Sequence, residues 1–196
     1  YTSYGLRKAI RSHQISSPTI SESIDLGRTN ACNSCHVDKS LAWANKFLVN
    51  WYAQSDKTLN SEYSTLSYTA LQSLKGDAAQ RALAYYHMGQ SDPQNISGTD
   101  WMLPFLAEGL MDPYDANRQI AFRTLRSIIK MDDSDYNFLA EEKIRRNKRN
   151  SLIKNWQKNS TIQNNPAVLI RNGIFQGDIM NELINERDHT PINLLE

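Results

Sequence analysis

The chain has 196 residues, of which 40% are hydrophobic and 22% charged, and its formal net charge is +1. This balance is typical of a globular protein and excludes a disordered chain. The near-neutral charge gives no general attraction to nucleic acid, so we expect no nucleic-acid partner. No apolar run approaches the roughly 20 residues of a membrane-spanning helix, so we expect no membrane span. A first residue Tyr1 instead of Met is expected of a mature, processed or truncated chain.

The first 60 residues are expected to form an irregular arm followed by one helix. Residues 1–30 are rich in Ser and Thr and contain scattered Gly and Pro, a composition that favours irregular structure. An amphipathic helix is predicted over residues 38–52, with Asp38 as a candidate cap. Its apolar positions recur at three- and four-residue steps, at Leu41, Ala44, Leu48 and Trp51.

Helical hairpins are expected to fill residues 61–196. Helices are predicted over 63–74 and 77–88, and a second pair is separated by Asp112-Pro113, with its second helix running from Asp115 to about Lys130. Two antiparallel helices around such a turn resemble a HEAT repeat, and the earlier pair is expected to stack on it. A charged helix over about 135–158 and a last helix over about 166–186 complete an all-α prediction without strands. The N-terminal arm with its first helix (1–60) and the HEAT-like region (61–196) are expected to form one compact unit.

The two cysteines of the chain, Cys32 and Cys35, lie in the sequence CNSCH, directly before His36. Several chemistries compete for them. Structural zinc needs four ligands and favours more cysteines than two. A thioredoxin-like pair would accompany a βαβ unit, which the pattern does not show. Two buried free thiols are a further alternative. Covalent haem fits best, because in CxxCH both thiols add to the haem vinyl groups and the histidine becomes the proximal iron ligand.

The segments around this motif carry a family resemblance. HQISSP and GRTNACNSCHVDKSLAWANKFLVNWY, followed downstream by RALAYYHMG, SGTDWMLPFLAEGLMDPYDANRQIAFRTL and RDHTPINLLE, resemble the terminal module of multihaem c-type cytochromes with HEAT-like or other helical repeats. The resemblance covers nearly the whole chain. It implies one covalently attached haem c. Such proteins usually carry further haem motifs upstream, so a fragment of a larger multihaem protein or a one-haem relative is expected.

His13 is the candidate for the distal axial ligand of the iron. It lies in the Ser-rich arm, far enough before Cys32 for the chain to loop back over the other haem face, and it matches the corresponding position of the family that the chain resembles. Met102 or Met111 is the alternative ligand. His87 and His189 are expected to have packing or surface roles. Ligation by His36 and His13 would leave the iron no free site and stabilise its ferric form, which favours electron transfer over catalysis.

The function expected is one-electron transfer, within a larger multihaem protein or complex and with redox proteins or other haem domains as partners. Attachment to CxxCH takes place outside the cytoplasm, so a periplasmic or extracellular location follows. Two alternatives stay open. The chain could be a module of a multihaem oxidoreductase whose catalysis occurs at another haem, or a protein-interaction scaffold in which the haem holds the N-terminal arm in place. Trp43, Trp51 and Tyr52 are expected to line the haem or the core. The basic stretch 143–150 is expected to be a solvated helix face, with docking of an acidic partner or neutralisation of the haem propionates as alternatives.

Overall fold

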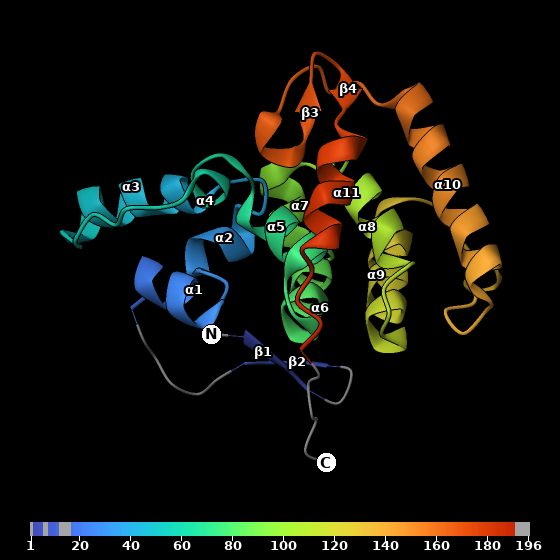
Figure 1. Ribbon diagram of the computed structural model, residues 1–196, viewed down its shortest axis with the longest axis horizontal. Helices are drawn as coiled ribbons and strands as arrows, with labels where there is room; N and C mark the ends of the chain where they lie inside the picture. The colour runs from blue at the N-terminus through green and yellow to red at the C-terminus, as the bar shows by residue number, and fades with distance from the viewer. Residues whose placement is uncertain (1, 6–7, 12–16, 191–196) are drawn as a thin grey trace.

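The computed structural model describes the backbone of residues 2–5 and 8–11, and both backbone and side chains of residues 17–190 (Figure 1). Helices dominate this part of the chain, and the strands are short two-stranded pairs. The predicted all-α class is therefore confirmed. Among the described residues, none of the helices combines the length and apolar character needed to cross a membrane.

Two stacked helical hairpins form the centre of the molecule (Figure 1). The first pairs α5 (Tyr68–Lys75) with α6 (Ala78–Met88), and the second pairs α8 (Met102–Gly109) with α9 (Asp115–Ile128). The second helices of the two hairpins, α6 and α9, pack against each other. This arrangement confirms the predicted stacking, which buries the apolar faces that one hairpin would leave exposed.

The main core lies between these four helices. Its fully buried members come from both hairpins and include Leu71, Tyr85, Met102, Phe105, Leu106 and Leu125. Burying a large apolar side chain stabilises a fold by about 1.5–3 kcal/mol, so this cluster is the main source of stability in the region.

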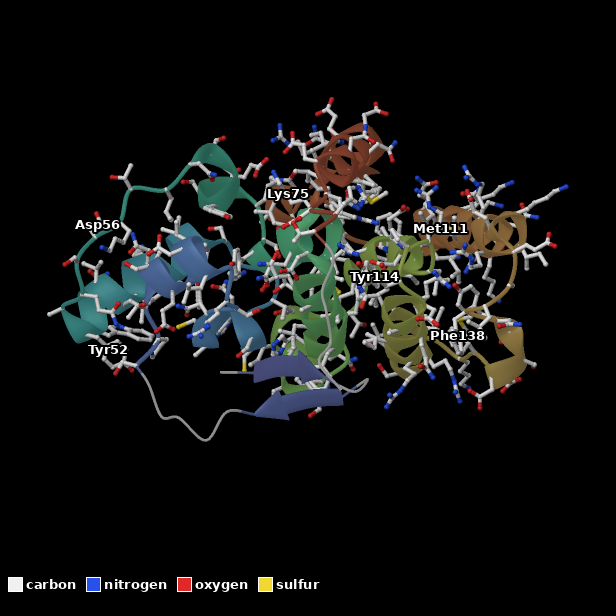
Figure 2. The ribbon with its side chains drawn as sticks, turned by 60° about the horizontal axis from the view of Figure 1, so that its bottom comes forward. Tyr52, Asp56, Lys75, Met111, Tyr114 and Phe138 are labelled. Carbon is white, nitrogen blue, oxygen red and sulfur yellow. The ribbon has the colours of Figure 1, made fainter. Side chains whose placement is uncertain are left out.

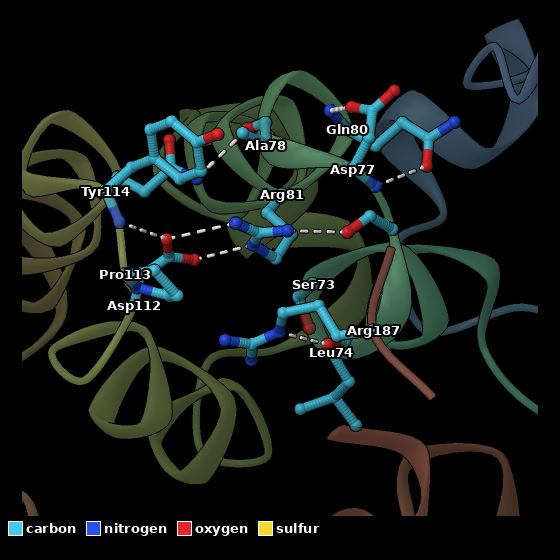
Figure 3. Close-up of polar contacts among 12 residues, drawn as sticks. Ser73, Leu74, Asp77, Ala78, Gln80, Arg81, Asp112, Pro113, Tyr114 and Arg187 are labelled. Atoms are coloured by element: carbon cyan, nitrogen blue, oxygen red, sulfur yellow. Dashed lines mark hydrogen bonds and ion pairs between the residues drawn. The ribbon is translucent and has the colours of Figure 1, made fainter. Parts of the chain in front are cut away.

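A buried ion pair ties the first hairpin to the turn of the second (Figure 3). Arg81 on α6 and Asp112 in the α8–α9 turn are 1% and 0% exposed, and the guanidinium donates two bonds of 2.6 and 3.1 Å to the carboxylate. Asp112 also accepts from the backbone N–H of Tyr114, and Arg118 donates to the carbonyls of Asp112 and Pro113. The Asp-Pro turn is therefore held from both sides.

Two flanking helices cover the outer sides of the hairpins, with boundaries that differ from the prediction. α10 (Glu142–Asn159) packs against α8, and α11 (Gly177–Asn185) packs against α5. Both begin later than predicted. A 3-10 turn, η1 (Asp133–Asp135), stands where α10 was expected to start, and the Asp135 side chain closes it by accepting the backbone N–H of Asp132 over 2.7 Å. Before α11 lie η2 (Pro166–Val168) and the antiparallel strands β3 (Ile170–Arg171) and β4 (Ile174–Phe175).

The N-terminal arm is more ordered than predicted. β1 (Thr2–Gly5) and β2 (Lys8–Arg11) form an antiparallel hairpin beside α6. α1 (Ile20–Leu26) begins after its N-cap Thr19 and ends at Gly27, whose φ of 62° favours glycine. The expectation of an irregular, strand-free arm is therefore wrong in these segments. Local caps and turns created regular elements that the Ser/Thr-rich composition did not reveal.

The first long helix, α3 (Leu41–Tyr52), begins after Ser40, whose side chain caps it. Asp38, the predicted cap, instead forms an ion pair with Lys39. Leu41, Ala44 and Leu48 are buried against Ile20 and Tyr68, in a second and smaller core, as their spacing predicts. Trp51 is 68% exposed, so it does not belong to this buried face.

Hydrogen bonds to α5 join the arm to the repeats. The hydroxyl of Tyr68 donates to the carbonyl of Ser23 over 2.9 Å, and the amide of Gln72 donates to the carbonyl of Gly27 over 2.7 Å. The short helices α4 (Ser61–Thr65) and α7 (Ser91–Ser97) lie in the connections. Helix α5 therefore packs within the first hairpin and also holds the N-terminal arm.

Candidate cofactor-attachment site

The CNSCH motif begins on a short helix, α2 (Ala31–Cys35). Asn30 caps it, because its side-chain oxygen accepts the backbone N–H of Cys32 over 3.0 Å. The amide of Asn30 also donates to the carbonyl of Thr19, which ties the cap to the start of α1. His36 ends the helix, and its backbone N–H donates to the carbonyl of Cys32 over 2.9 Å.

The helical backbone gives the two thiols a common direction. Residues three apart in an α-helix lie on the same face, so Cys32 and Cys35 are presented side by side. Both are half-buried free thiols. His36 follows immediately at the end of the helix. The three predicted side chains are therefore brought to one short segment of fixed conformation.

Bonds from other elements hold α2 in place. Asn33, which is fully buried, donates to the carbonyl of Lys39 over 2.9 Å, and its own backbone carbonyl accepts from Thr69 on α5. The carbonyl of Cys35 accepts from the hydroxyl of Ser97 on α7. The side-chain oxygen of Asn33 is buried without a hydrogen-bond partner. These contacts make the motif part of the folded body. The sequence did not predict that Asn33 anchors α2. The one feature that could have drawn attention to it is its position between the two cysteines.

The environment of Cys32 favours a neutral thiol. This residue packs against the second core, which contains Leu41 and Leu48. Burial raises the pKa of the Cys32 thiol above its ordinary value; a backbone hydrogen bond lowers it and the neighbouring Cys35 raises it, both more weakly. A nucleophilic CxxC pair has the opposite property, a depressed thiol pKa. The site therefore lacks the electrostatics of a thioredoxin-like redox pair.

Zinc also fits poorly. Among the residues that the structure describes, no group of three His, Cys, Asp or Glu side chains converges as a metal-binding set. Structural zinc needs four such ligands around one point. Cys32, Cys35 and His36 supply three candidate ligands, so a structural zinc site would need a fourth from elsewhere in the chain.

The imidazole of His36 is positioned by an aromatic neighbour. Its ring lies 4.6 Å from the ring of Trp43, centroid to centroid, with an interplanar angle of 46°. Within the part of the chain described, the ring nitrogens of His36 make no side-chain hydrogen bond. The ring is therefore oriented by packing while a nitrogen remains available to a metal.

The other candidate iron ligands lie in different environments. His13 lies outside the described residues. His87 is 6% exposed near the end of α6, and burial lowers the pKa of its imidazole to about 4, so the ring is neutral at physiological pH. His189 is exposed near the end of the described region. Met102 is fully buried in the main core, whereas Cys32 contacts the second core, and this location gives Met102 no support as an iron ligand.

A small pocket borders α2. His87, Ser23 and Asn30 line it together with Ala31 and Ser34, and its volume is about 130 Å³. Cofactor pockets usually enclose about 300–1,000 Å³, so this cavity is too small for a porphyrin. Ala31 and Ser34 each precede a cysteine, so the cavity lies on a different side of the helix from the thiols.

The basic stretch 143–150 lies on α10, at the opposite edge of the molecule from α3 (Figure 1). Part of its charge is already paired: Arg149 contacts Glu108 over 2.6 Å, and Lys148 lies 3.7 Å from Asp135. This location argues against neutralisation of haem propionates near α2. Most of the remaining basic side chains face solvent, as a solvated helix face would.

Comparison with protein-family models, with curated proteins and with solved structures found no match to this chain.

Proposed function

We propose that this chain is a c-type cytochrome domain that carries one covalently attached haem and transfers single electrons. The observation that supports this most directly is the geometry of α2. Two unpaired thiols share one face of a capped helix, and the His36 imidazole follows at its end, packed on Trp43. Covalent haem attachment uses all three groups, whereas the zinc and disulfide-exchange alternatives each lack a required property.

Each residue has a defined part in this proposal. Cys32 and Cys35 would hold the haem through two thioether bonds, each thiol adding its S–H across one vinyl group without a net change of oxidation state. His36 supplies the proximal nitrogen to the iron, and His13 is proposed as the distal ligand. When bound, the haem supplies a reversible one-electron Fe(III)/Fe(II) couple.

The remaining expectations follow from the same proposal. An iron with two histidine ligands has no open position for a substrate, so electron transfer is favoured over catalysis at this haem. Haem attachment of this kind places the protein in the periplasm or outside the cell. Its partners would be redox proteins or other haem domains, within a larger multihaem protein or complex.

Intact mass and optical spectra of protein produced with a haem-attachment system test the proposal. We expect the polypeptide mass plus one haem, resistant to extraction by acidic organic solvent, and a low-spin spectrum. Cys32→Ser with Cys35→Ser should abolish the covalent adduct. His13→Ala should convert the iron to a high-spin form that binds carbon monoxide rapidly, whereas His189→Ala, the matched control, should not. The bare polypeptide mass in the unaltered protein would refute the proposal.

A further inference from the structure

Helix α3 has two apolar rows, and the second of them leaves the core along its length. Leu41, Ala44 and Leu48 are buried. Trp43, Phe47 and Trp51 follow one another at four-residue intervals, so they form a second row along the helix. Trp43 and Phe47 are half-buried, while Trp51 is 68% exposed. Core packing accounts for the first row and for Trp43, which packs against the second core, but it leaves Phe47 and the exposed Trp51 unexplained.

The rings of this second row are in continuous contact and begin at His36. The centroid separation is 4.6 Å from His36 to Trp43, 4.8 Å from Trp43 to Phe47 and 4.6 Å from Phe47 to Trp51. We call these four residues the aromatic row. Such separations are those of directly packed rings. The row therefore connects the proposed iron ligand with the solvent through packed side chains.

A packed row of rings has a physical consequence for electron transfer. The probability of electron tunnelling falls less steeply through bonded and closely packed atoms than across a gap or through water. The aromatic row begins at an atom group that would be bonded to the iron. Its other end is an exposed Trp51 next to Tyr52, which is also 68% exposed; Figure 2 shows Tyr52 at the end of the molecule away from Phe138.

The small exposed surface of Trp51 and Tyr52 indicates what kind of contact a partner would make there. Electron-transfer complexes are weak and bury less than about 1,200 Å². Trp and Tyr are the side chains most often responsible for binding energy at such contacts. Two adjacent exposed aromatics at the end of one helix match a small, transient contact and not a large permanent interface.

Building on the proposed function, we propose that the aromatic row is the route by which an electron passes between the iron held at His36 and a second haem protein that makes contact at Trp51. In the outward direction, Fe(II) on this chain becomes Fe(III) and the Fe(III) of the partner becomes Fe(II). No bond is formed or broken and no proton moves. Phe47 couples the two tryptophans, and Trp51 is the point of exit.

The route is tested by photochemical injection of an electron at its exposed end. In the holoprotein the native thiols are consumed as thioethers, so Tyr52→Cys provides a single thiol for a ruthenium bipyridyl label. Flash photolysis then measures the rate of electron transfer between label and haem. We expect Phe47→Leu to slow this rate several-fold. A label at Leu26→Cys, exposed on α1 and outside the row, is the matched control, and its rate should not respond to Phe47→Leu.

The exit point is tested by electron self-exchange between ferric and ferrous copies of the holoprotein, measured by NMR. Trp51→Leu should slow self-exchange several-fold, whereas Tyr52→Leu, equally exposed but outside the row, should have a smaller effect. Every variant should still carry the mass of one covalent haem and keep its spin state and reduction potential, because none of them alters an iron ligand. Trp51 is exposed, so its replacement leaves folding intact.

The outcomes separate this proposal from the proposed function. Holoprotein with normal mass and spectrum, but equal rates with Phe or Leu at position 47 and equal self-exchange without Trp51, would overturn the route while leaving the cytochrome assignment in place. Equal slowing from both label positions would also overturn it, because the effect would then be general. A chain without covalent haem would refute the function itself.

Discussion

The buried pair between Arg81 and Asp112 gives the sharpest prediction about stability. We expect Asp112→Ala to destabilise the protein by about 3–5 kcal/mol, because it leaves a guanidinium that is 1% exposed without its counter-ion. Burial alone would lower the pKa of Arg81, but its hydrogen bonds and charge contact with Asp112 raise it above the ordinary value, so the charge persists. The remaining acceptors, the carbonyls of Gly76 at 2.7 Å and Asp188 at 3.4 Å, do not neutralise that charge.

This loss is a large part of the total, because domains are usually stable by only about 5–15 kcal/mol. At about 2–4 °C per kcal/mol for a chain of this size, the midpoint of thermal unfolding should fall by roughly 10 °C. Urea unfolding followed by circular dichroism measures the change. The double variant Arg81→Met with Asp112→Ala should recover much of the stability, because it removes the buried charge together with its partner.

A surface pair provides the control for this prediction. Arg146 and Glu142 form an ion pair on α10 in which both side chains are 61% exposed. Replacing Glu142 by Ala should cost less than about 1 kcal/mol. An Asp112→Ala variant whose free energy of unfolding lies within about 1 kcal/mol of the unaltered protein would refute the reasoning, since it would mean that water or another group solvates Arg81 in the interior.

Three further predictions concern the same fold and site. The pKa of His87 falls to about 4 in the folded state, below its unfolded value of roughly 6.5. Its contribution to stability is therefore complete above pH 6.5 and is lost as the pH falls towards 4. Urea unfolding at pH 4.5 should show a loss of about 2–3 kcal/mol in the free energy of unfolding, and His87→Gln should not show this loss. Gly109→Ala should destabilise the protein by about 1–3 kcal/mol in thermal unfolding, because the added carbon would meet the Ala121 side chain at 2.6 Å. Gly177→Ala is the control: the space around this residue is open, so the change should be neutral or slightly stabilising. Asn30→Ala should cost about 1 kcal/mol and lower the yield of covalent haem, measured by intact mass, because it removes the cap of α2; a normal yield at lowered stability would separate the two roles.

The hairpin region was predictable from the sequence because its signals are local and agree with one another. Asp112-Pro113 breaks the helices, and Asp77 with Gln80 forms a capping box at the start of α6. The later boundaries were harder. Residues 135–158 resemble one charged helix because few apolar side chains mark its start, and β3 and β4 have only two residues each, too few to show alternation.

The residues of the candidate site could be singled out from the sequence, but their surroundings could not. The spacing of CNSCH is enough to single out Cys32, Cys35 and His36, whereas the contacts that fix them come from residues far away in sequence, such as Thr69 and Ser97. The position of Trp51 shows the limit of periodicity. It lies three residues after the buried Leu48, which is compatible with the same face, but the helix turns it towards solvent in line with Phe47. Spacing alone does not distinguish a wide apolar face from two separate ones.

The hydrogen bonds from α5 to the arm should hold the protein together after proteolytic cleavage between the arm and the repeats. Residues 53–60 form neither helix nor strand and are mostly exposed, which makes them the natural target of a protease between the arm and the repeats. A cut there would break one covalent link, yet Tyr68 and Gln72 would still hold the arm, and so would the second core, which spans both sides of the cut. The nicked protein would remain one particle, with Cys32 and Cys35 on the shorter fragment and the residues of α5 that support them on the longer.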